Sequence, residues 1–66
     1  MRIKANGKEE EIEQNFSVLE FLGKKGIRPE TVAVELNGTV LAKDEYARTR
    51  LGRGDALEIV KFVGGG

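Results

Sequence analysis

Apolar and basic residues alternate over the first stretch of the chain, which is the pattern of a β-strand with one buried face. Residues 1–5 show this alternation, and the Asn6-Gly7 pair that follows accepts the positive φ angles of a two-residue hairpin turn. The next residues are polar apart from one isoleucine. The pattern predicts a hairpin with strands at about 1–6 and 8–14, and the charged second strand suits a sheet edge.

A short amphipathic segment over about residues 17–25 is predicted to form a helix. Ser17 and Glu20 have the spacing of a capping box, in which each side chain accepts a hydrogen bond from the other residue's backbone N–H. Phe16 and Phe21 stand at the positions of a hydrophobic staple around the same helix start. These signals predict the first residue of the helix more firmly than they predict its length.

The apolar side chains of this helix are expected to pack on one side. Val18, Leu19 and Leu22 lie close enough around the helix to form its core face. After the last turn, Gly26 suits a left-handed residue, and Ile27 is placed to contact Leu22 as in a Schellman ending. The sequence therefore predicts both ends of the helix and a core face.

Alternation resumes in the second half of the chain. It predicts strands at about 31–36 and 39–42, joined by Asn37-Gly38, which repeats the hairpin signal. Residues 43–54 have no regular period and are expected to form an irregular connection with a short helical turn. A last strand is predicted at about 56–62.

The order of these elements is hairpin, helix, hairpin, irregular connection and strand. It predicts an α+β fold, the ubiquitin-like β-grasp, with a mixed sheet of about five strands and one main helix packed across it. The last strand is expected at the centre of the sheet, parallel to the first. Residues 1–63 are predicted to form a single domain, followed by a flexible glycine tail at 64–66.

Composition narrows the chemistry that side chains can perform. The 66 residues include eleven basic and eleven acidic residues, and neither cysteine nor histidine. A disulfide and the usual zinc ligands are thus excluded, and no metal site or bound cofactor is expected. A net charge of zero gives no general attraction to nucleic acid. No apolar run approaches the roughly 20 residues of a membrane span, and no signal peptide is apparent, so we expect a cytoplasmic protein.

The register of the last strand predicts an exposed apolar surface. If Leu57 and Ile59 face the helix, the alternate residues face the other side of the sheet, where no second helix is available to cover them. Val60 and Phe62 are expected on that face, and together with Val63 they are the residues expected to dock a partner. No catalytic side chain is predicted, so the carboxylate of Gly66 is the candidate reactive group. Taken alone, the three glycines fit a frayed end or a cloning remnant equally well.

Three segments resemble the ThiS family of sulfur carriers in thiamine biosynthesis. They are residues 32–38, 43–46 and 54–66, and the similarity extends over essentially the whole chain. The closing segment, a Gly-Asp turn, a strand and a Phe-Val-Gly-Gly-Gly end, is the most specific. Ala42 departs from the family, which often has proline there, and this is expected to alter loop stiffness rather than function.

The resemblance implies a sulfur carrier that is a cosubstrate of enzymes rather than an enzyme. An E1-like adenylyltransferase would use ATP to adenylylate the carboxylate of Gly66, while Gly64 and Gly65 thread into its active site. Sulfur from a cysteine desulfurase or another donor would give a thiocarboxylate, and thiazole synthase would take that sulfur into the thiazole of thiamine. The free protein is expected to be a monomer that contacts neither nucleic acid nor membrane.

Three alternatives remain open at this point. A molybdopterin-type or other sulfur carrier shares the fold and the Gly-Gly end. A ubiquitin-like modifier conjugated to proteins through Gly66 shares the first activation step. A small binding module would need no reactive end, although the neutral charge argues against one that binds RNA.

Overall fold

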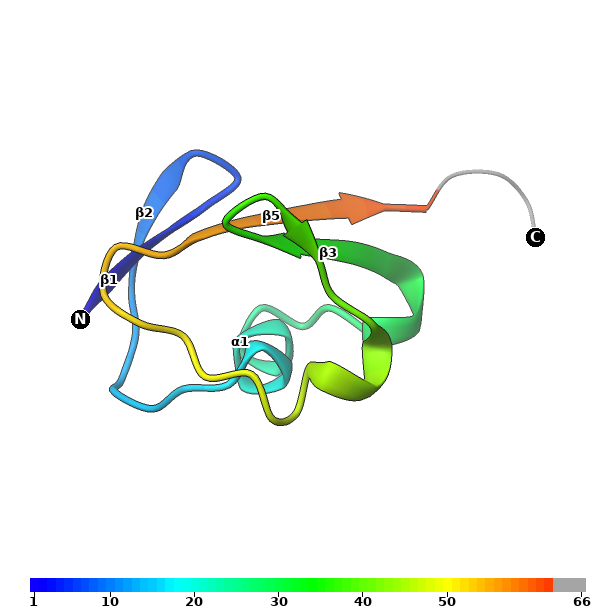
Figure 1. Cartoon of the computed structure of the whole chain (residues 1–66), viewed down its shortest axis with the longest axis horizontal. Helices are drawn as coiled ribbons and strands as arrows, with labels where there is room; N and C mark the ends of the chain where they lie inside the picture. The colour runs from blue at the N-terminus through cyan, green and yellow to red at the C-terminus, as the bar shows by residue number, and fades with distance from the viewer. Residues whose placement is uncertain (63–66) are drawn as a thin grey trace.

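The computed structural model describes residues 1–62, and one mixed sheet contains every strand of these residues. The strands are β1 (Arg2–Ala5), β2 (Lys8–Glu11), β3 (Val32–Leu36), β4 (Thr39–Val40) and β5 (Ala56–Lys61). Their order across the sheet is β2-β1-β5-β3-β4, and β5 runs parallel to β1 and antiparallel to β3 (Figure 1). The predicted β-grasp arrangement, with the last strand central and parallel to the first, is confirmed.

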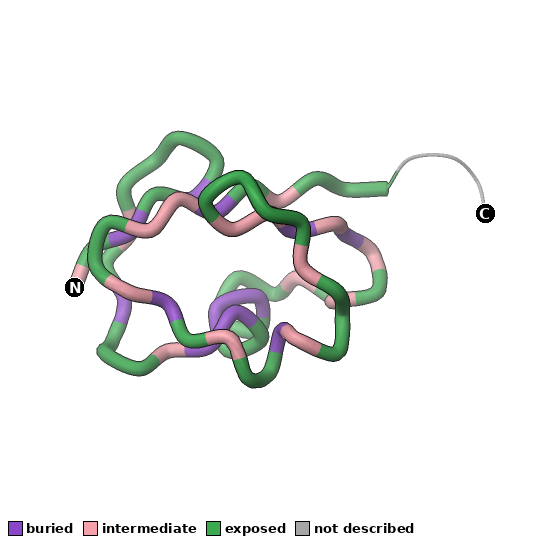
Figure 2. Tube along the Cα trace, viewed as in Figure 1, coloured by how far each residue is buried: buried purple, intermediate pink, exposed green. Residues whose placement is uncertain are grey.

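The helix α1 (Val18–Lys24) packs across one face of the sheet, and two 3-10 turns, η1 (Pro29–Thr31) and η2 (Lys43–Glu45), complete that layer (Figure 1). The core lies between the sheet and this layer (Figure 2). It consists of Ile3, Ala5, Ile12, Val18, Phe21, Leu22, Val32, Val34, Tyr46, Leu51 and Leu57. All of the core is therefore on one side of the sheet, and no helix of residues 1–62 covers the other side.

Both predicted hairpin turns form with the expected backbone. Asn6 and Gly7 have φ angles of 52° and 81°, and Asn37 and Gly38 have φ angles of 52° and 87°. Strand β2 is shorter than predicted, since it ends at Glu11 rather than near residue 14. The next residue, Ile12, is buried and still exchanges both backbone hydrogen bonds with Met1, at 2.8 and 2.7 Å, so the pairing ends with the first residue of the chain.

The start of α1 has the predicted capping box. The N–H of Glu20 donates to the Ser17 hydroxyl at 3.0 Å, and the N–H of Ser17 donates to the Glu20 carboxylate at 2.8 Å. The bond from the Ser17 backbone N–H to the carboxylate is the main cause that holds the pKa of Glu20 below its ordinary value. The pair satisfies donors that a helix start leaves without intrahelical partners.

The predicted core face of α1 was wrong in one residue. Val18 and Leu22 are fully buried as expected, but Leu19 is 39% exposed and Phe21 is fully buried in its place. Residues three and four apart share a helix face, whereas Leu19 is rotated about 100° from Val18. Four apolar residues among five left the face ambiguous, and packing against the sheet selected the one that buries the larger aromatic ring.

The end of α1 follows the predicted Schellman pattern. Gly26 has a φ of 72°, and the N–H of Ile27 donates to the carbonyl of Leu22 at 2.9 Å. The Gly26 N–H donates to the carbonyl of Gly23 at 3.0 Å. These bonds turn the chain back towards η1 and β3.

The connection between β4 and β5 is irregular, yet its apolar residues hold it to the core. Tyr46, at the end of η2, and Leu51 are both buried, and the Leu51 N–H donates to the carbonyl of Phe16 at 2.8 Å. Burial raises the pKa of Tyr46, and a backbone hydrogen bond at Val34 acts in the opposite direction. Gly54, with a φ of 81°, turns the chain into β5. Strand β5 ends at Lys61, one residue before its predicted end at 62, and β4 ends at Val40 rather than at about residue 42.

Candidate docking site along strand β5

Strand β5 is held on both sides, which fixes the direction in which the chain leaves the domain. Five residue pairs join it to β3, but only two pairs join it to β1. Beyond β1 the side chain of Asn6 takes over, donating to the Ile59 carbonyl at 3.1 Å and accepting from the Ile59 N–H at 2.7 Å. The side-chain amide of Asn6 thus forms the two hydrogen bonds that a further residue of β1 would form with β5.

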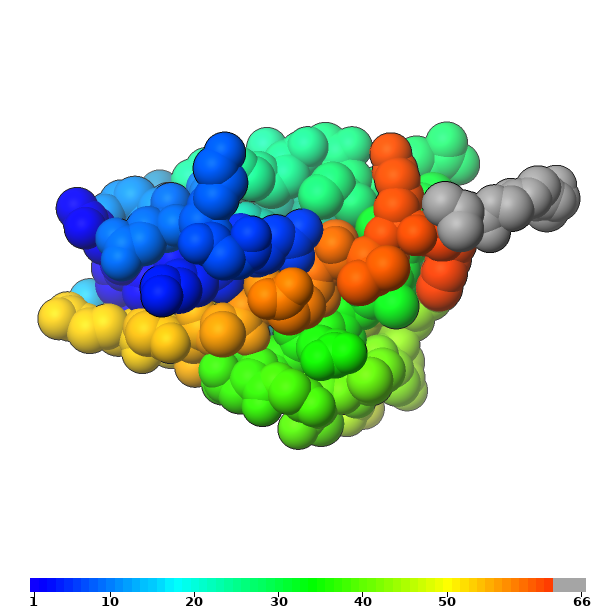
Figure 3. Space-filling view, turned by 90° about the horizontal axis from the view of Figure 1, so that it is seen from above, coloured from blue at the N-terminus to red at the C-terminus, as the bar shows by residue number. Residues whose placement is uncertain are grey.

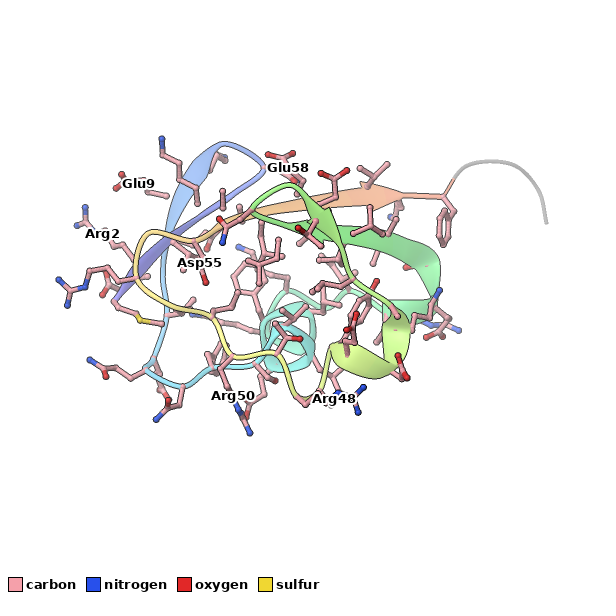
Figure 4. The ribbon with its side chains drawn as sticks, viewed as in Figure 1. Arg2, Glu9, Arg48, Arg50, Asp55 and Glu58 are labelled. Atoms are coloured by element: carbon pink, nitrogen blue, oxygen red, sulfur yellow. The ribbon has the colours of Figure 1, made fainter. Side chains whose placement is uncertain are left out.

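The second hairpin supports the start of β5 in a similar way. The Asn37 side chain accepts from the N–H of Ala56 at 2.9 Å and donates to the Asp55 carboxylate at 3.1 Å. Asp55 in turn accepts from the N–H of Gly52 at 2.6 Å (Figure 4). The Asn-Gly signals predicted the turns, but they did not predict that both asparagines would brace the last strand.

The predicted docking residues within the described chain are exposed. Val60 is 59% exposed and Phe62 is 58% exposed, whereas Leu57 is fully buried against the helix layer. Phe62 follows the last residue of β5, and its ring centroid lies 5.3 Å from the Nζ of Lys43 in η2. Val60 therefore belongs to the open sheet face, while Phe62 borders the end of the sheet next to η2.

The remaining predicted site residues lie outside the described residues. They are Val63, Gly64, Gly65 and Gly66. Their roles in docking, threading and modification stay predictions.

The open face of the sheet also carries residues that the sequence reasoning missed. Glu35 on β3 is paired in register with Glu58 on β5 and with Val40 on β4. Two residues further along β5, Val60 is paired with Ala33 on β3. Val40 is 66% exposed. Figure 3 looks onto this face, where the strands lie side by side without a helix of the described chain over them. The alternating burial along β3 is consistent with the placement of Ala33 and Glu35 on this face, but their cross-strand partners depend on long-range pairing.

The other end of the same face is charge-balanced. Arg2 pairs with Glu9 at 3.1 Å and with Glu11 at 3.3 Å, and the amino terminus reaches Glu11 at 3.2 Å (Figure 4). Hydrogen bonds from the amino terminus and then from Arg2 hold the pKa of Glu11 below its ordinary value. The same contacts raise the pKa of Arg2, chiefly through Glu11. Arg2, Glu9 and Glu11 at this end of the face therefore have charged partners within the domain.

A groove of about 430 Å³ lies on the helix side, beside the second half of β5. Its lining is apolar at Phe21, Ile27 and Ile59, and lysines at positions 8, 25 and 61 stand around it. One of these, Lys25, is already paired with Glu10 at 2.7 Å. The two sides of β5 thus differ in charge, basic around the groove and acidic on the open face.

Two arginines of the irregular connection, Arg48 and Arg50, lie near acidic side chains. Arg48 lies 3.9 Å from Asp44, and Arg50 lies 3.6 Å from Glu20 (Figure 4). Over residues 1–62 there is no group of three or more acidic, histidine or cysteine residues arranged to hold a metal. Within the same residues, no helix is long and apolar enough to cross a membrane.

Comparison with known proteins gives consistent matches over the whole chain. The ThiS family matches residues 1–66. A crystal structure of the thiamine biosynthesis protein ThiS from Geobacter metallireducens is 36% identical, covers 100% of both chains and has a TM-score of 0.86. The solution structure of a thiamine biosynthesis protein from the same organism has a TM-score of 0.79, at 36% identity, over 100% of this chain and 88% of that one.

Two curated relatives are much longer proteins. Both are named thiazole synthase; one from Paramagnetospirillum magneticum is 39% identical and one from Magnetococcus marinus is 36% identical, each over all 66 residues of this chain. The chain spans only 20% of the length of each of these relatives. In those proteins a segment similar to this chain therefore shares one polypeptide with a larger remainder.

Proposed function

The chain belongs to the ThiS family, and from that membership we propose that it is a sulfur carrier of thiamine biosynthesis and acts as a cosubstrate of partner enzymes. The observation that carries the proposal is the similarity over 100% of both chains to the ThiS structure from Geobacter metallireducens. The β-grasp sheet, with β5 at its centre and the segment 64–66 of glycines following in the sequence, supports the same role.

The proposed chemistry takes place at the carboxylate of Gly66, as the free C-terminus of the working protein. A carboxylate is a poor acceptor, because attack on it must place more charge on an anionic group. In the first step a Gly66 oxygen attacks the α-phosphorus of ATP in the adenylyltransferase, and pyrophosphate leaves. In the second step sulfide, or a donor equivalent to it, attacks the carbonyl carbon and AMP leaves. The product is a thiocarboxylate.

The residue types around the reacting group suit this chemistry. Glycines have no Cβ, so residues 64–66 can pass through a narrow channel and approach an active site closely. A thiocarboxylic acid is more acidic than a thiol, so its sulfur is ionised and nucleophilic at neutral pH. The sequence contains no cysteine, and therefore no side-chain thiol competes for the activated carbonyl.

A partner enzyme must also recover the cost of ordering the end of the chain. Holding residues 63–66 in one conformation costs about 1–2 kcal/mol per residue, or about 4–8 kcal/mol in total. Burying the exposed parts of Val60 and Phe62 returns about 1–2 kcal/mol each, because full burial of such a side chain is worth about 1.5–3 kcal/mol. The two docking residues therefore cover only part of the cost. Hydrogen bonds to the tail backbone and further surface contacts must supply the rest.

The proposed acceptor of the sulfur is a thiazole synthase. This part of the proposal is supported by the two relatives of that name, in which a segment similar to this chain makes up 20% of the protein. A carrier and an acceptor that occur in one polypeptide are expected to act on each other.

Reconstitution tests the proposal. The chain is incubated with a ThiS-activating adenylyltransferase, Mg-ATP and sulfide, and its intact mass is then measured. We expect an increase of about 16 Da, which is the exchange of one oxygen for sulfur, located in the C-terminal fragment. The matched control is the chain without Gly65 and Gly66, which keeps residues 1–64 and should gain no mass. An unchanged mass for the full chain, under conditions that convert a known ThiS protein, would count against the sulfur carrier.

A further inference from the structure

The two hairpin tips carry the same dipeptide, asparagine followed by glycine, at residues 6–7 and 37–38. In such a pair the glycine nitrogen can approach the asparagine side chain closely, because glycine has no Cβ to hinder it. Chain neighbours apart, no heavy atom lies within 4 Å of the point where a Cβ on Gly7 or Gly38 would stand. Within the described residues, neither glycine N–H donates a backbone hydrogen bond. Both tips therefore allow the glycine nitrogen to react with the adjacent side chain.

The reaction open to such a pair is deamidation, and its steps can be written for Asn6 and Gly7. The Gly7 nitrogen loses its proton to hydroxide and attacks Cγ of Asn6. The bond from Cγ to the side-chain nitrogen breaks, and ammonia leaves with a proton from water. The product is a cyclic imide, which water opens at either carbonyl carbon to give aspartate or isoaspartate. One water is consumed and one ammonia is released, so the reaction needs no enzyme, oxidant or reductant.

The charges around the first hairpin tip favour this reaction. The attacking nitrogen and the tetrahedral intermediate are both anionic, so a nearby cation stabilises them and a nearby anion destabilises them. Asn6 lines the groove beside β5, and the lysines at positions 8, 25 and 61 stand around the same groove. Within the described residues, Lys25 alone among these lysines forms an ion pair, with Glu10. Two cations at the groove are therefore left to stabilise the anionic intermediate.

The same dipeptide in the second hairpin is held by an anion. The Asn37 side chain donates to the Asp55 carboxylate at 3.1 Å and accepts from the Ala56 N–H at 2.9 Å. A hydrogen bond to a carboxylate is stronger than one between neutral groups, so it holds this amide more firmly. The negative charge of Asp55 also opposes the formation of an anionic intermediate beside it. The second pair is therefore expected to react more slowly than the first.

We propose that Asn6-Gly7 is a site of spontaneous deamidation, that it reacts faster than Asn37-Gly38, and that its conversion to isoaspartate releases the second half of β5 from the first hairpin. Ring opening to isoaspartate moves the carboxylate from Cγ to Cα and lengthens the backbone of the turn by one carbon. The carboxylate then no longer lies where the Asn6 amide bonded to Ile59, at 3.1 and 2.7 Å. The turn geometry, with a positive φ at both residues, is lost as well.

The two hydrogen bonds from Asn6 to Ile59 also slow the reaction in the intact chain. They restrain the movement of Cγ towards the Gly7 nitrogen, so ring closure follows their local opening. The pairing of β1 with β5 ends at Leu57, and the first hairpin stops short of the end of β5 (Figure 1). Contacts at such an end open at a lower free-energy cost than the whole domain. Each conversion removes bonds that cannot re-form, so the loosened fraction grows with the age of the protein.

The first test ages the purified full-length chain at neutral pH and physiological temperature and follows each asparagine by peptide mapping. Conversion adds about 1 Da, and electron-transfer fragmentation distinguishes isoaspartate from aspartate. We expect Asn6 to convert about threefold or more faster than Asn37 in the folded chain. In urea, where the surrounding charges are dispersed, the two rates should agree within about twofold. Asn15 is the internal control, because it is exposed and has a positive φ but is followed by Phe16, whose side chain hinders the attack, so it should stay unconverted.

A pair of charge variants tests the role of the groove lysines. K8Q/K61Q removes the two lysines that have no acidic partner among the described residues, and we expect Asn6 to convert about two- to threefold more slowly while Asn37 keeps its rate. The matched control K24Q/K43Q removes the same charge from α1 and η2, outside the groove. It should leave both rates within about 1.5-fold of the original. Equal slowing of Asn6 in the two variants would overturn the assigned role of the groove lysines.

The consequence for β5 is tested on a chain made by chemical synthesis with isoaspartate at position 6, which a length of 66 residues allows. We expect amide exchange at Ile59 to be about 10-fold or more faster than in the original chain, with a smaller increase within α1. The variant N6D keeps the turn backbone and an acceptor for the Ile59 N–H, so its change should be smaller.

Three results would overturn the proposal. They are an unchanged exchange rate at Ile59 in the isoaspartate chain, equal conversion of Asn6 and Asn37 in the folded chain, and an aged chain in which Asn6 stays intact. No partner takes part in the reaction, so these results do not depend on the sulfur-carrier function.

Discussion

Replacement of Asn6 by glycine tests how the last strand is held in place. The substitution keeps a residue that tolerates the φ of 52° at this turn, and it keeps the bond from the residue 6 N–H to the Leu57 carbonyl. It removes the two side-chain hydrogen bonds to Ile59, at 3.1 and 2.7 Å. The change therefore isolates the bracing of β5 beyond the reach of β1.

The magnitude follows from those two bonds. Each contributes about 0.5–1.5 kcal/mol net, and water replaces part of that at an exposed site, so we expect a loss of about 1–2 kcal/mol. A domain of this size is stable by roughly 3–10 kcal/mol, so the variant loses a substantial fraction. The corresponding fall in melting temperature is about 7–14 °C. Urea denaturation measures the free energy, and amide exchange at Ile59 should accelerate more than exchange in α1.

Asn15→Gly is the matched control for this experiment. Asn15 also has a positive φ, 63°, but its backbone carbonyl makes its contact, accepting from Arg50, and within the described residues its side chain forms no hydrogen bond. The control therefore reports the backbone effect of introducing glycine. If both variants lose the same stability to within about 0.3 kcal/mol, the bracing role of Asn6 is refuted.

Three further predictions concern the core, the helix end and acid pH. Phe21→Ala should cost about 3–5 kcal/mol and leave much of the chain unfolded by circular dichroism, whereas Leu19→Ala should cost less than about 1 kcal/mol; similar losses would contradict the corrected helix face. Gly26→Ala should destabilise by about 1 kcal/mol because of its left-handed backbone, while Gly23→Ala should stabilise by about 0.5–1 kcal/mol, and thermal melts that reversed this order would contradict the assigned helix end. The pKa of Glu20 is lowered by the N-cap N–H, so its contribution to stability should be complete above about pH 4.5 and be lost as the pH falls through its folded pKa; an NMR titration midpoint at or above the ordinary glutamate value would contradict the capping box.

Local signals predicted most of the fold because each one carries its own geometry. The two Asn-Gly turns, the capping box at Ser17 and the left-handed Gly26 all formed as expected. Each involves residues within a few positions of one another, so no long-range information was needed. The choice between Leu19 and Phe21 for the core required the position of the sheet, and there the sequence pattern failed.

The candidate site was predicted in part for the same reason. Alternation along one strand was enough to predict that Val60 is exposed, because Val60 and the buried Leu57 lie on opposite faces of β5. The opposition of Glu35 and Glu58 depends on the register between strands that are distant in sequence. The contact from Asn6 to Ile59 spans 53 positions. Neither feature has a local signature, and both became visible only when the strands were paired.

The central claim is that the carboxylate of Gly66 is the sulfur-bearing group of the working protein. The most direct measurement is the intact mass, with C-terminal fragmentation, of the native protein isolated from cells of its source organism that are making thiamine. A sulfur carrier is expected to yield a chain that ends at Gly66, part of it heavier by about 16 Da at that residue. A native chain that continues beyond Gly66, or one found only as branched conjugates with other proteins, would contradict the account.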